Sequence, residues 1–225
     1  MEDLRLRALD YLRERGGVVD GELFLLTVPP GPAVPPGPAV PSGAAVLSGA
    51  AVLSGAAVPL GAAVPALGVP VVQRSEPGSL ASSSGGVPRP PEVEVVLIDE
   101  TAPVGLIREN LEVNERGFDT SAGPVSYEQA AAFRPQLVGA RAVTIRVAGE
   151  PVAAGMALPV WSGVAELAGI TTLSTARRRG LGCMVTITLI EAAATLGADL
   201  IILSTSDADA RRLYTSVGFH HVPMS

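Results

Sequence analysis

The stretch with the most chemical content is an arginine- and glycine-rich segment, Arg177-x-x-Gly180-x-Gly182. Because glycine has no Cβ, backbone N–H groups beside it can approach a ligand closely. An apolar pattern with helical spacing follows from Cys183 to Leu196, and the first turn of a helix offers unpaired N–H donors at the positive end of its dipole. Together with the charge of the arginines, these features predict a phosphate-binding loop.

The usual nucleotide-binding motifs do not account for this loop. The chain has no lysine, so it lacks a Gly-x-x-x-x-Gly-Lys-Ser/Thr motif, and it also lacks a Gly-x-Gly-x-x-Gly fingerprint. Taken alone, the segment is equally consistent with a surface turn whose arginines are solvated. Its interpretation therefore depends on the elements around it.

A second ordered motif follows the helix. A buried strand is expected at Leu200–Thr205, and after it comes Asp207-x-x-Ala210-x-x-Leu213-Tyr214-x-x-x-Gly218-Phe219. With both motifs in this order, the chain from Val93 to Val222 resembles the GNAT (GCN5-related N-acetyltransferase) family. In that family an Arg/Gln-x-x-Gly-x-Gly/Ala loop binds the pyrophosphate of acetyl-CoA. A later Asn-x-x-Ala-x-x-x-Tyr-x-x-x-Gly-Phe segment carries a tyrosine near the CoA sulfur. This sequence matches the loop and has Asp207 where asparagine is usual.

The resemblance implies an acetyl-CoA-dependent N-acetyltransferase that moves an acetyl group by direct attack of an amine. It also implies that backbone groups at the end of the central strand pair with the pantetheine arm, and that the loop holds the pyrophosphate. The cofactor-binding residues expected on this basis are Ile170, Thr171, Thr172, Arg177, Arg178, Arg179, Gly180, Leu181, Gly182, Cys183 and Asp207.

Acetyl transfer also needs two proton-transferring side chains. An alkylammonium with a pKa near ~10 must lose a proton before it can attack, and we assign this base role to Glu166 on the central strand. The departing CoA thiolate needs a proton, and the resemblance makes Tyr214 the candidate acid. A backbone N–H at Ile170 or Thr172 would polarise the thioester carbonyl.

Each of these assignments has an ordinary structural alternative. Tyr214 could be a core residue, and Glu166 could face solvent or pair with an arginine. Asp119 and Glu128 are alternative bases, although loops and first helical turns are often acidic for other reasons. Cys183 is expected to be a small buried residue rather than a nucleophile, because it belongs to the phosphate loop.

Composition narrows the partners and the compartment. The net charge of −6 argues against nucleic-acid binding, and the charged, amphipathic start of the chain is unlike a signal peptide. A single cysteine excludes an internal disulfide and suits a reducing cytoplasm. Adjacent residues His220 and His221 would face opposite ways in a strand, so no metal site is predicted. The expected partners are acetyl-CoA and an amine-bearing acceptor, with no membrane and with a homodimer left open.

Hydrophobic periodicity predicts the elements that would position these residues. Strands are expected at Val93–Ile98, Ala142–Val147, Val152–Val160, Val164–Thr172 and Leu200–Thr205, and helices at Pro103–Val113, Tyr127–Leu137, Cys183–Leu196 and around Tyr214. Asn114–Pro124 is expected to be a loop. This order predicts an α/β (α+β) fold, in which a mixed central sheet has helices on both faces. The family usually has two strands after the tyrosine helix, so the last one is expected to be missing or to come from a partner.

The chain divides into three parts. Residues 1–30 hold an expected helix, Glu2–Arg15, and strand, Leu23–Val28, and are interpreted as a short segment that could be the remnant of a first GNAT-like unit. Residues 31–91 form a low-complexity stretch of Gly, Ala, Val and Pro with a glycine every sixth residue from Gly31 to Gly61. A disordered linker explains it best, with a hexapeptide β-solenoid and a membrane span as alternatives. Residues 92–225 form the acetyltransferase domain. A non-catalytic acyl-CoA sensor and a scaffold organised by the repeat are the alternative functions.

Overall fold

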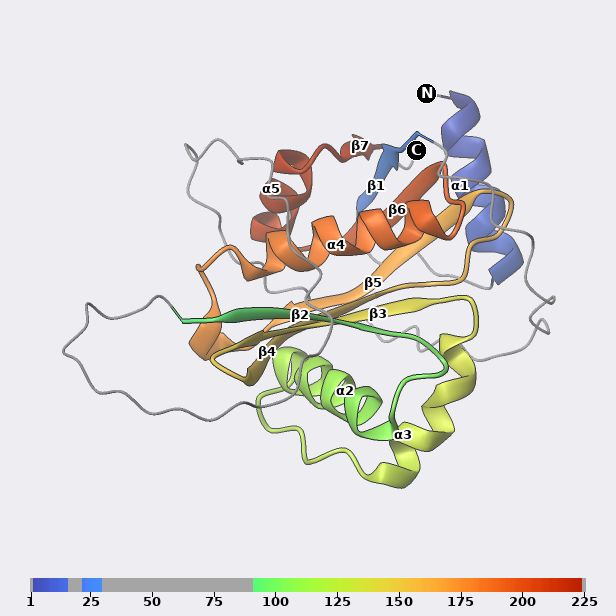
Figure 1. Ribbon diagram of the computed structural model, residues 1–225. Helices are drawn as coiled ribbons and strands as arrows, with labels where there is room; N and C mark the ends of the chain where they lie inside the picture. The colour runs from blue at the N-terminus through green and yellow to red at the C-terminus, as the bar shows by residue number, and fades with distance from the viewer. Residues whose placement is uncertain (1, 16–21, 30–90, 224–225) are drawn as a thin grey trace, which may run out of the picture.

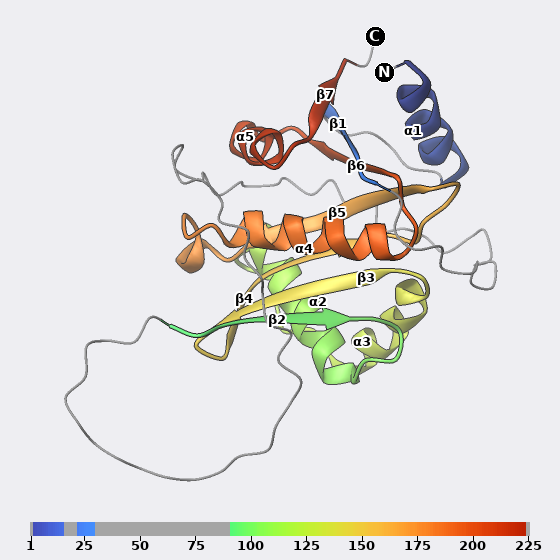
Figure 2. The same ribbon diagram turned by 45° about the horizontal axis from the view of Figure 1, so that its top comes forward.

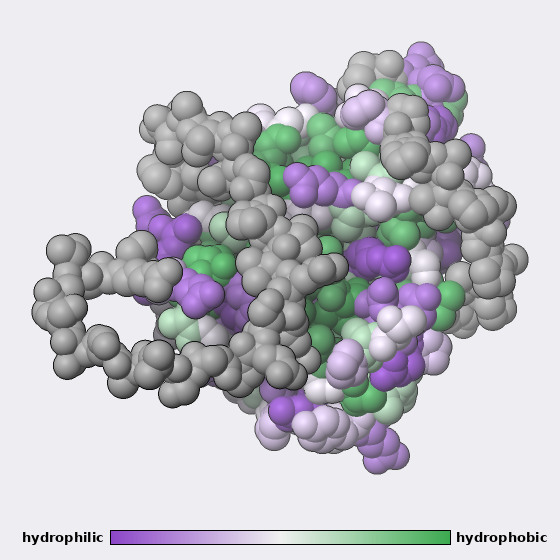
Figure 3. All heavy atoms as spheres, viewed as in Figure 1, coloured by the Kyte–Doolittle hydropathy of each residue, from purple (hydrophilic) through white to green (hydrophobic). Residues whose placement is uncertain are grey.

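The computed structural model describes residues 2–15, 22–29 and 91–223. The glycine repeat and its three interpretations therefore lie outside the described residues. Within these ranges, no helix is both long and apolar enough to span a membrane. On the side shown in Figure 3, hydrophobic and hydrophilic residues are interspersed over the surface.

The described residues fold around one mixed sheet (Figure 1). Its seven strands lie in the order β2-β3-β4-β5-β6-β1-β7, and among them only β5 and β6 pair in parallel. The strands are β1 Glu22–Thr27, β2 Val93–Ile98, β3 Arg141–Val147, β4 Glu150–Ala157, β5 Val164–Thr172, β6 Leu200–Thr205 and β7 His220–Val222. The helices are α1 Glu2–Arg15, α2 Val104–Phe118, α3 Tyr127–Phe133, α4 Leu181–Thr195 and α5 Ala208–Ser216, with short 3-10 turns at η1 Arg134–Leu137 and η2 Ser174–Ala176.

Helices cover both faces of this sheet. Figures 1 and 2 show α4 on one side and α2 and α3 on the other. On β6, Ile201 and Leu203 join the core under α4 and α5, whereas Leu200 and Ile202 join the core under α1. Because side chains alternate along a strand, α1 covers the face opposite α4. The predicted α/β (α+β) fold with helices on both faces is confirmed.

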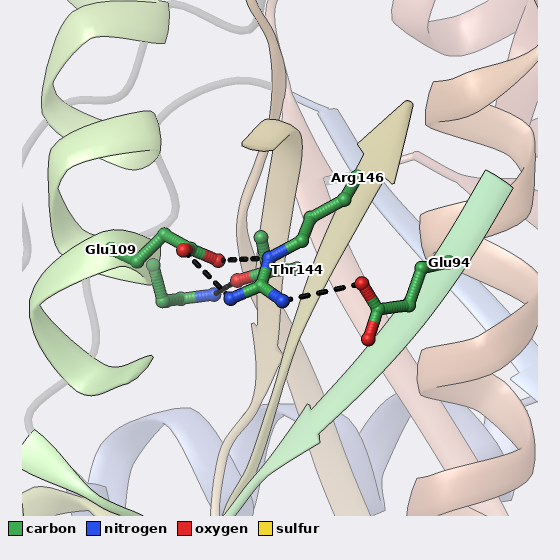
Figure 4. Close-up of polar contacts among 5 residues, drawn as sticks. Glu94, Glu109, Thr144 and Arg146 are labelled. Carbon is green, nitrogen blue, oxygen red and sulfur yellow. Dashed lines mark hydrogen bonds and ion pairs between the residues drawn. The ribbon is translucent and has the colours of Figure 1, made fainter. Parts of the chain in front are cut away.

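A polar network ties α2 to the edge of the sheet (Figure 4). The Arg146 guanidinium donates two hydrogen bonds of 2.8 Å to the Glu109 carboxylate of α2, and a third of 3.2 Å to Glu94 on β2. One residue further along α2, Asn110 donates to the buried Thr144 hydroxyl at 3.0 Å. A bidentate arginine–carboxylate pair fixes orientation as well as distance, so α2 is held in one rotational setting against β3.

Helix α2 is longer than the sequence predicts. It continues through Asn114 and Gly117 to Phe118, where a loop was expected. A Cβ on Gly117 would overlap the Thr171 side chain of β5. Glycine and asparagine are weak helix formers, but here the glycine lets the helix backbone lie directly on the strand. Tertiary packing therefore overrides local propensity in the last turns of α2.

The strand that was expected to be missing comes from the start of this chain. Strand β1 lies between β6 and β7 and is antiparallel to both. Leu25 pairs with Ile202 on one side and with His220 on the other. Strand β7 pairs with β1 alone among the described strands. Both sheet faces are covered at β1, and Leu23, Phe24 and Leu25 are all buried accordingly.

Candidate active site

The central strand β5 carries a bulge near its end. Ala157 pairs with Leu167 and Met156 with Ala168, but Ala154 already pairs with Thr171. One extra residue has therefore been inserted in β5 opposite Gly155. Gly169, at this point, has φ +62°, a left-handed conformation that glycine adopts without steric cost.

The bulge changes which residues of β5 direct their backbone N–H and C=O groups toward β4. Before it, the Glu166 carbonyl accepts from the Leu158 N–H on the β4 side at 2.8 Å. After it, the Leu173 N–H donates to Val152 on that same side at 2.9 Å. Because backbone groups alternate along an antiparallel pair, the backbone groups of Ile170 and Thr172 point away from β4 and toward the β6 side.

Strand β6 does not continue alongside these groups. The parallel pairing of β5 with β6 covers only Val164–Glu166 and Leu200–Ile202, and β6 then continues to Thr205 paired with β1. On the β6 side, the described residues thus give Ile170 and Thr172 no strand partner. The chain of a ligand could pair there in the manner of an added strand.

The arginine–glycine loop leads from β5 into α4. Arg178 has φ +62° and Gly180 has φ +77°, so the chain turns twice through the left-handed region before the helix. Turns of this kind gather successive N–H groups into an anion-binding concavity. No side chain caps the start of α4 at Gly180, and the Met184 N–H donates to the Gly180 carbonyl at 3.0 Å. The side chains of Arg178 and Arg179 are exposed.

Arg177 differs from the two arginines after it. Its Nε donates to the Thr172 carbonyl at 3.1 Å, and its Nη2 donates to the Gly117 carbonyl of α2 at 3.4 Å. The side chain therefore links the end of β5 to the end of α2. This geometry fits an anchor of the loop better than a charge presented to a ligand.

Three segments of the predicted site meet at Gly182. A Cβ at this position would lie 3.2 Å from Cδ1 of Leu213 on α5 and 3.8 Å from Oγ1 of Thr172 on β5. The structure thus brings together most of the expected cofactor-binding residues: Ile170, Thr171 and Thr172 at the end of β5, and Arg177, Arg178, Arg179, Gly180, Leu181, Gly182 and Cys183 from the loop to the first turn of α4.

The candidate acid Tyr214 is buried on the same side as α4. Its ring centroid lies 5.9 Å from that of Phe219 and 6.3 Å from that of Phe24 on β1. Burial raises the pKa of Tyr214, and the nearby Asp207 carboxylate raises it further. The phenol is therefore protonated at neutral pH, as an acid must be.

Asp207 caps helix α5. Its Oδ1 accepts from the N–H groups of Asp209 at 2.7 Å and Ala210 at 2.9 Å. Aspartate and asparagine are similarly good at this position, because each supplies a side-chain oxygen to the first turn. The departure from the usual asparagine keeps the local structure that the tyrosine helix requires.

The candidate base Glu166 lies on the other face of the sheet. Its neighbours Ala165 and Leu167 belong to the core under α4 that also contains Tyr214, so by alternation Glu166 faces α1. Burial raises the pKa of Glu166 to about 7, and the positive charge of Arg15 on α1 offsets part of this effect. The structure therefore does not bring Glu166 and Tyr214 onto one face.

The remaining candidates are less suited to chemistry. Hydrogen bonds from the hydroxyl and N–H of Ser121 lower the pKa of the exposed Asp119, which weakens it as a base. Glu128 is exposed in the first turn of α3. Burial raises the pKa of the Cys183 thiol, so it is not an activated nucleophile. No group of three or more potential metal ligands occurs in the part of the chain that the structure describes.

Sequence analysis missed several residues that shape this site. Asn114 was assigned to a loop, yet its Nδ2 donates to the Gly169 carbonyl in the bulge at 2.6 Å. Phe24 and Arg15 also lie far from the site in sequence. The Phe24 ring packs near the Tyr214 ring, and the Arg15 charge offsets part of the rise that burial causes in the pKa of Glu166. Only the asparagine could have given a local signal, because the other two depend on the long-range pairing of β1 and packing of α1.

The fold is thus an α/β sheet in which the parallel strands β5 and β6 part near the glycine-rich start of α4, which no side chain caps. A family model described as the acetyltransferase (GNAT) family matches residues 99–219, more than half of the chain. The chain belongs to the GNAT family of acetyltransferases.

Solved structures of acetyltransferases are similar to this chain. A GCN5-related N-acetyltransferase from Kribbella flavida is 28% identical, with a TM-score of 0.44, over 57% of this chain and 46% of that one. Glucosamine-6-phosphate N-acetyltransferase from Arabidopsis thaliana is 14% identical, with a TM-score of 0.48, over 60% and 95%. The aminoglycoside N-acetyltransferase AAC(6')-Iy in complex with CoA is 13% identical, with a TM-score of 0.47, over 62% and 95%. The chain thus spans less than half of the Kribbella protein. No curated protein matches it.

Proposed function

We propose that this chain is an acetyl-CoA-dependent N-acetyltransferase in which an amine attacks the acetyl thioester directly. The observation that carries the proposal is the meeting of three segments at Gly182, where the end of β5, the arginine–glycine loop and α5 come together. Family membership supports the acetyltransferase class.

The donor would be held mainly by backbone groups. The N–H groups from Arg178 to Cys183 would bind the pyrophosphate at the positive end of α4, with the exposed Arg178 and Arg179 adding charge. The backbone of Ile170 and Thr172 would pair with the pantetheine arm on the open side of β5. Asp207 would act indirectly by capping α5, and Arg177 would anchor the loop.

The transfer itself would use three groups of this chain. Glu166 would accept a proton from the amine, directly or through water, which frees the lone pair for attack. The Ile170 N–H would stabilise charge on the thioester oxygen as the C–N bond forms and the C–S bond breaks. Tyr214 would give its proton to the sulfur of the departing CoA. Because Glu166 and Tyr214 lie on opposite faces of the sheet, this mechanism requires the amine to reach Glu166, directly or through water, beyond the point where the β5–β6 pairing ends.

A non-catalytic acyl-CoA-binding domain is a second candidate. It is favoured by the placement of Glu166 under α1, on the face opposite Tyr214. The scaffold hypothesis depends on the glycine repeat, which lies outside the described residues.

Thermal unfolding with CoA, acetyl-CoA and ATP tests donor binding without knowledge of the acceptor. A ligand at about 100 times its Kd adds about 2.7 kcal/mol to the free energy of unfolding. For a domain of this size that corresponds to roughly 5–10 °C. We expect this rise with CoA and acetyl-CoA and a much smaller one with ATP. No rise with acetyl-CoA would contradict the proposal, whereas binding without acetylation of any amine in a broad panel would favour the second candidate.

Two glycines provide a matched pair of variants for this experiment. Gly180 and Gly149 both have positive φ, of +77° and +82°, and a Cβ on either would meet nothing within 4 Å. Valine therefore imposes a similar backbone strain at both positions. Gly180→Val should abolish the rise with acetyl-CoA, because it distorts the loop N–H groups. Gly149→Val, in the β3–β4 turn, should lower the melting temperature but keep the full rise.

A further inference from the structure

Two asparagines one turn apart on α2 hold backbone carbonyls of different strands. Asn110 donates from Nδ2 to the Val143 carbonyl of β3 at 2.9 Å, and Asn114 donates from Nδ2 to the Gly169 carbonyl of β5 at 2.6 Å. The first bond lies within a regular ladder of the sheet. The second lies at the bulge, where β5 shifts its register against β4.

The last turns of α2 fit closely around this bulge. A Cβ on Gly169 would lie 2.6 Å from Nδ2 of Asn114, and a Cβ on Gly117 would overlap the Thr171 side chain. Arg177 reaches back from the phosphate loop to the Gly117 carbonyl at 3.4 Å. Helix and bulge are therefore in direct contact on both sides of Ile170.

The bulge decides where the Ile170 N–H points. A shift of one residue in strand register exchanges the two directions in which backbone groups and side chains face. Without the extra residue, the Ile170 N–H would face β4 and be used in the ladder. With it, the N–H faces the open β6 side. The position of the Gly169 carbonyl therefore governs the direction of the following N–H.

We propose that Asn114 is a positioning residue for acetyl transfer. Its amide holds the Gly169 carbonyl and so keeps the bulge in the register that directs the Ile170 N–H toward the thioester oxygen. This inference rests on the proposed function and adds to it a residue on α2 that supports the polarising N–H.

Amide NMR of the full chain tests this role without an acceptor. Acetyl-CoA added to the wild type should shift the amide resonances of Ile170 and Thr172. In Asn114→Ala and in the similarly sized Asn114→Asp, which has no amide donor, the Ile170 shift should be lost, while loop amides such as Gly180 still respond. Asn110→Ala removes the bonds to Val143 and Thr144 of β3 but leaves the bond to Gly169 in place, so it should keep the Ile170 shift. An unchanged Ile170 shift in both Asn114 variants would overturn the inference.

Steady-state kinetics provide a second readout with whichever amine among spermidine, glucosamine and a lysine-containing peptide the wild type acetylates. Misplacing a reacting group by about an ångström costs roughly 10²-fold. Both Asn114 variants should therefore lower kcat by roughly 10- to 100-fold and leave KM for acetyl-CoA within about twofold. Asn110→Ala should keep kcat at a comparable loss of melting temperature. Equal kcat losses in Asn114→Ala and Asn110→Ala would show that Asn114 has only a structural role.

The failure of the proposed function is a separate outcome. If the wild type binds acetyl-CoA but acetylates no amine, catalysis fails, and the Ile170 shift alone decides whether Asn114 sets the direction of that N–H. If the wild type does not bind acetyl-CoA, both proposals are overturned.

Discussion

At the scale of single residues, the environment of Glu166 decides its chemistry. The carboxyl lies between β5 and α1, where burial raises its pKa from 4.5 to about 7 despite the nearby Arg15 charge. A base works best when its pKa lies near the operating pH, because it is then both available and strong enough to take the proton. The burial that is unfavourable for the ionised carboxylate thus suits the proposed proton transfer.

Glu166→Gln should change the pH dependence of the reaction. Only the ionised carboxylate can accept a proton, so wild-type kcat/KM should rise with pH through about 7. Glutamine cannot titrate, and the variant should show a lower rate without this acidic limb. A pH–rate profile over pH 5–9 measures the difference. An unchanged limb in the variant would assign the base to another group.

The stability of the same variant provides a check that needs no acceptor. Between the ordinary pKa of 4.5 and the folded value of about 7, the folded chain binds more protons than the unfolded one. The free energy of unfolding must then fall as pH rises, by at most ~1.4 kcal/mol per pH unit for one proton. Glu166→Gln should remove this slope in thermal unfolding between pH 5 and pH 7.

At the scale of elements, α5 begins at the capping residue Asp207, which stands where the family usually has asparagine. The Asp207 carboxylate accepts two N–H bonds in the first turn of the helix that carries Tyr214. Helix starts leave such donors unpaired unless a side chain or ligand satisfies them. The cap therefore sets where α5 begins and how Tyr214 is presented.

Asp207→Asn should leave stability and turnover almost unchanged, because asparagine caps about equally well. Asp207→Ala should cost about 1 kcal/mol in the free energy of unfolding and also lower kcat. Ser126 caps α3 by accepting from the Gln129 N–H at 3.1 Å, so Ser126→Ala is a control with a similar stability loss and unchanged kcat. Denaturant unfolding and kinetics measure both effects. A large loss of kcat in Asp207→Asn would show that the charge itself has a role.

At the scale of the whole molecule, the start of the chain completes the sheet. Strand β1 fills the position between β6 and β7, and α1 covers one face of the same region. Arg7 on α1 pairs with Asp199, and Glu22 on β1 accepts from Arg211 of α5 at 2.5 Å. Residues at the two ends of the chain thus form one folded unit around the candidate site.

Removal of residues 1–29 should therefore unfold the domain. Besides the small Ala8, five large side chains of the described part of this segment are buried: Tyr11, Leu12, Leu23, Phe24 and Leu25. At roughly 1.5–3 kcal/mol each, their burial is comparable to the ~5–15 kcal/mol that stabilises a typical domain. Circular dichroism should show no cooperative transition at 25–60 °C. A variant lacking 31–60 is the control, because the sequence predicts that this stretch adds little to a core. A cooperative transition without 1–29 would contradict this account.

The sequence alone determined the parts of the protein that depend on local pattern. Alternating and helical periodicities identified the sheet strands and their helices, because burial of one face imposes those periods. The order of the loop motif and the Tyr214 motif identified the family, since phosphate binding and helix capping need particular residues at fixed spacings. The predicted strand Val164–Thr172 and the start of the loop at Arg177 agree with the structure.

Only the tertiary structure decided features that depend on contacts between distant segments. The sequence did not show that β1 would enter the sheet between β6 and β7, because the residues of an apolar strand do not specify which strands it pairs with. It could not reveal the bulge at Gly169, since a bulge is a mismatch between two strands and not a property of one. Local propensity predicted that α2 would end at Val113. In the structure the helix continues, because the close packing of Gly117 on Thr171 stabilises turns that propensity disfavours. The sequence placed Glu166 and Tyr214 in one site, whereas alternation along β5 put them on opposite faces.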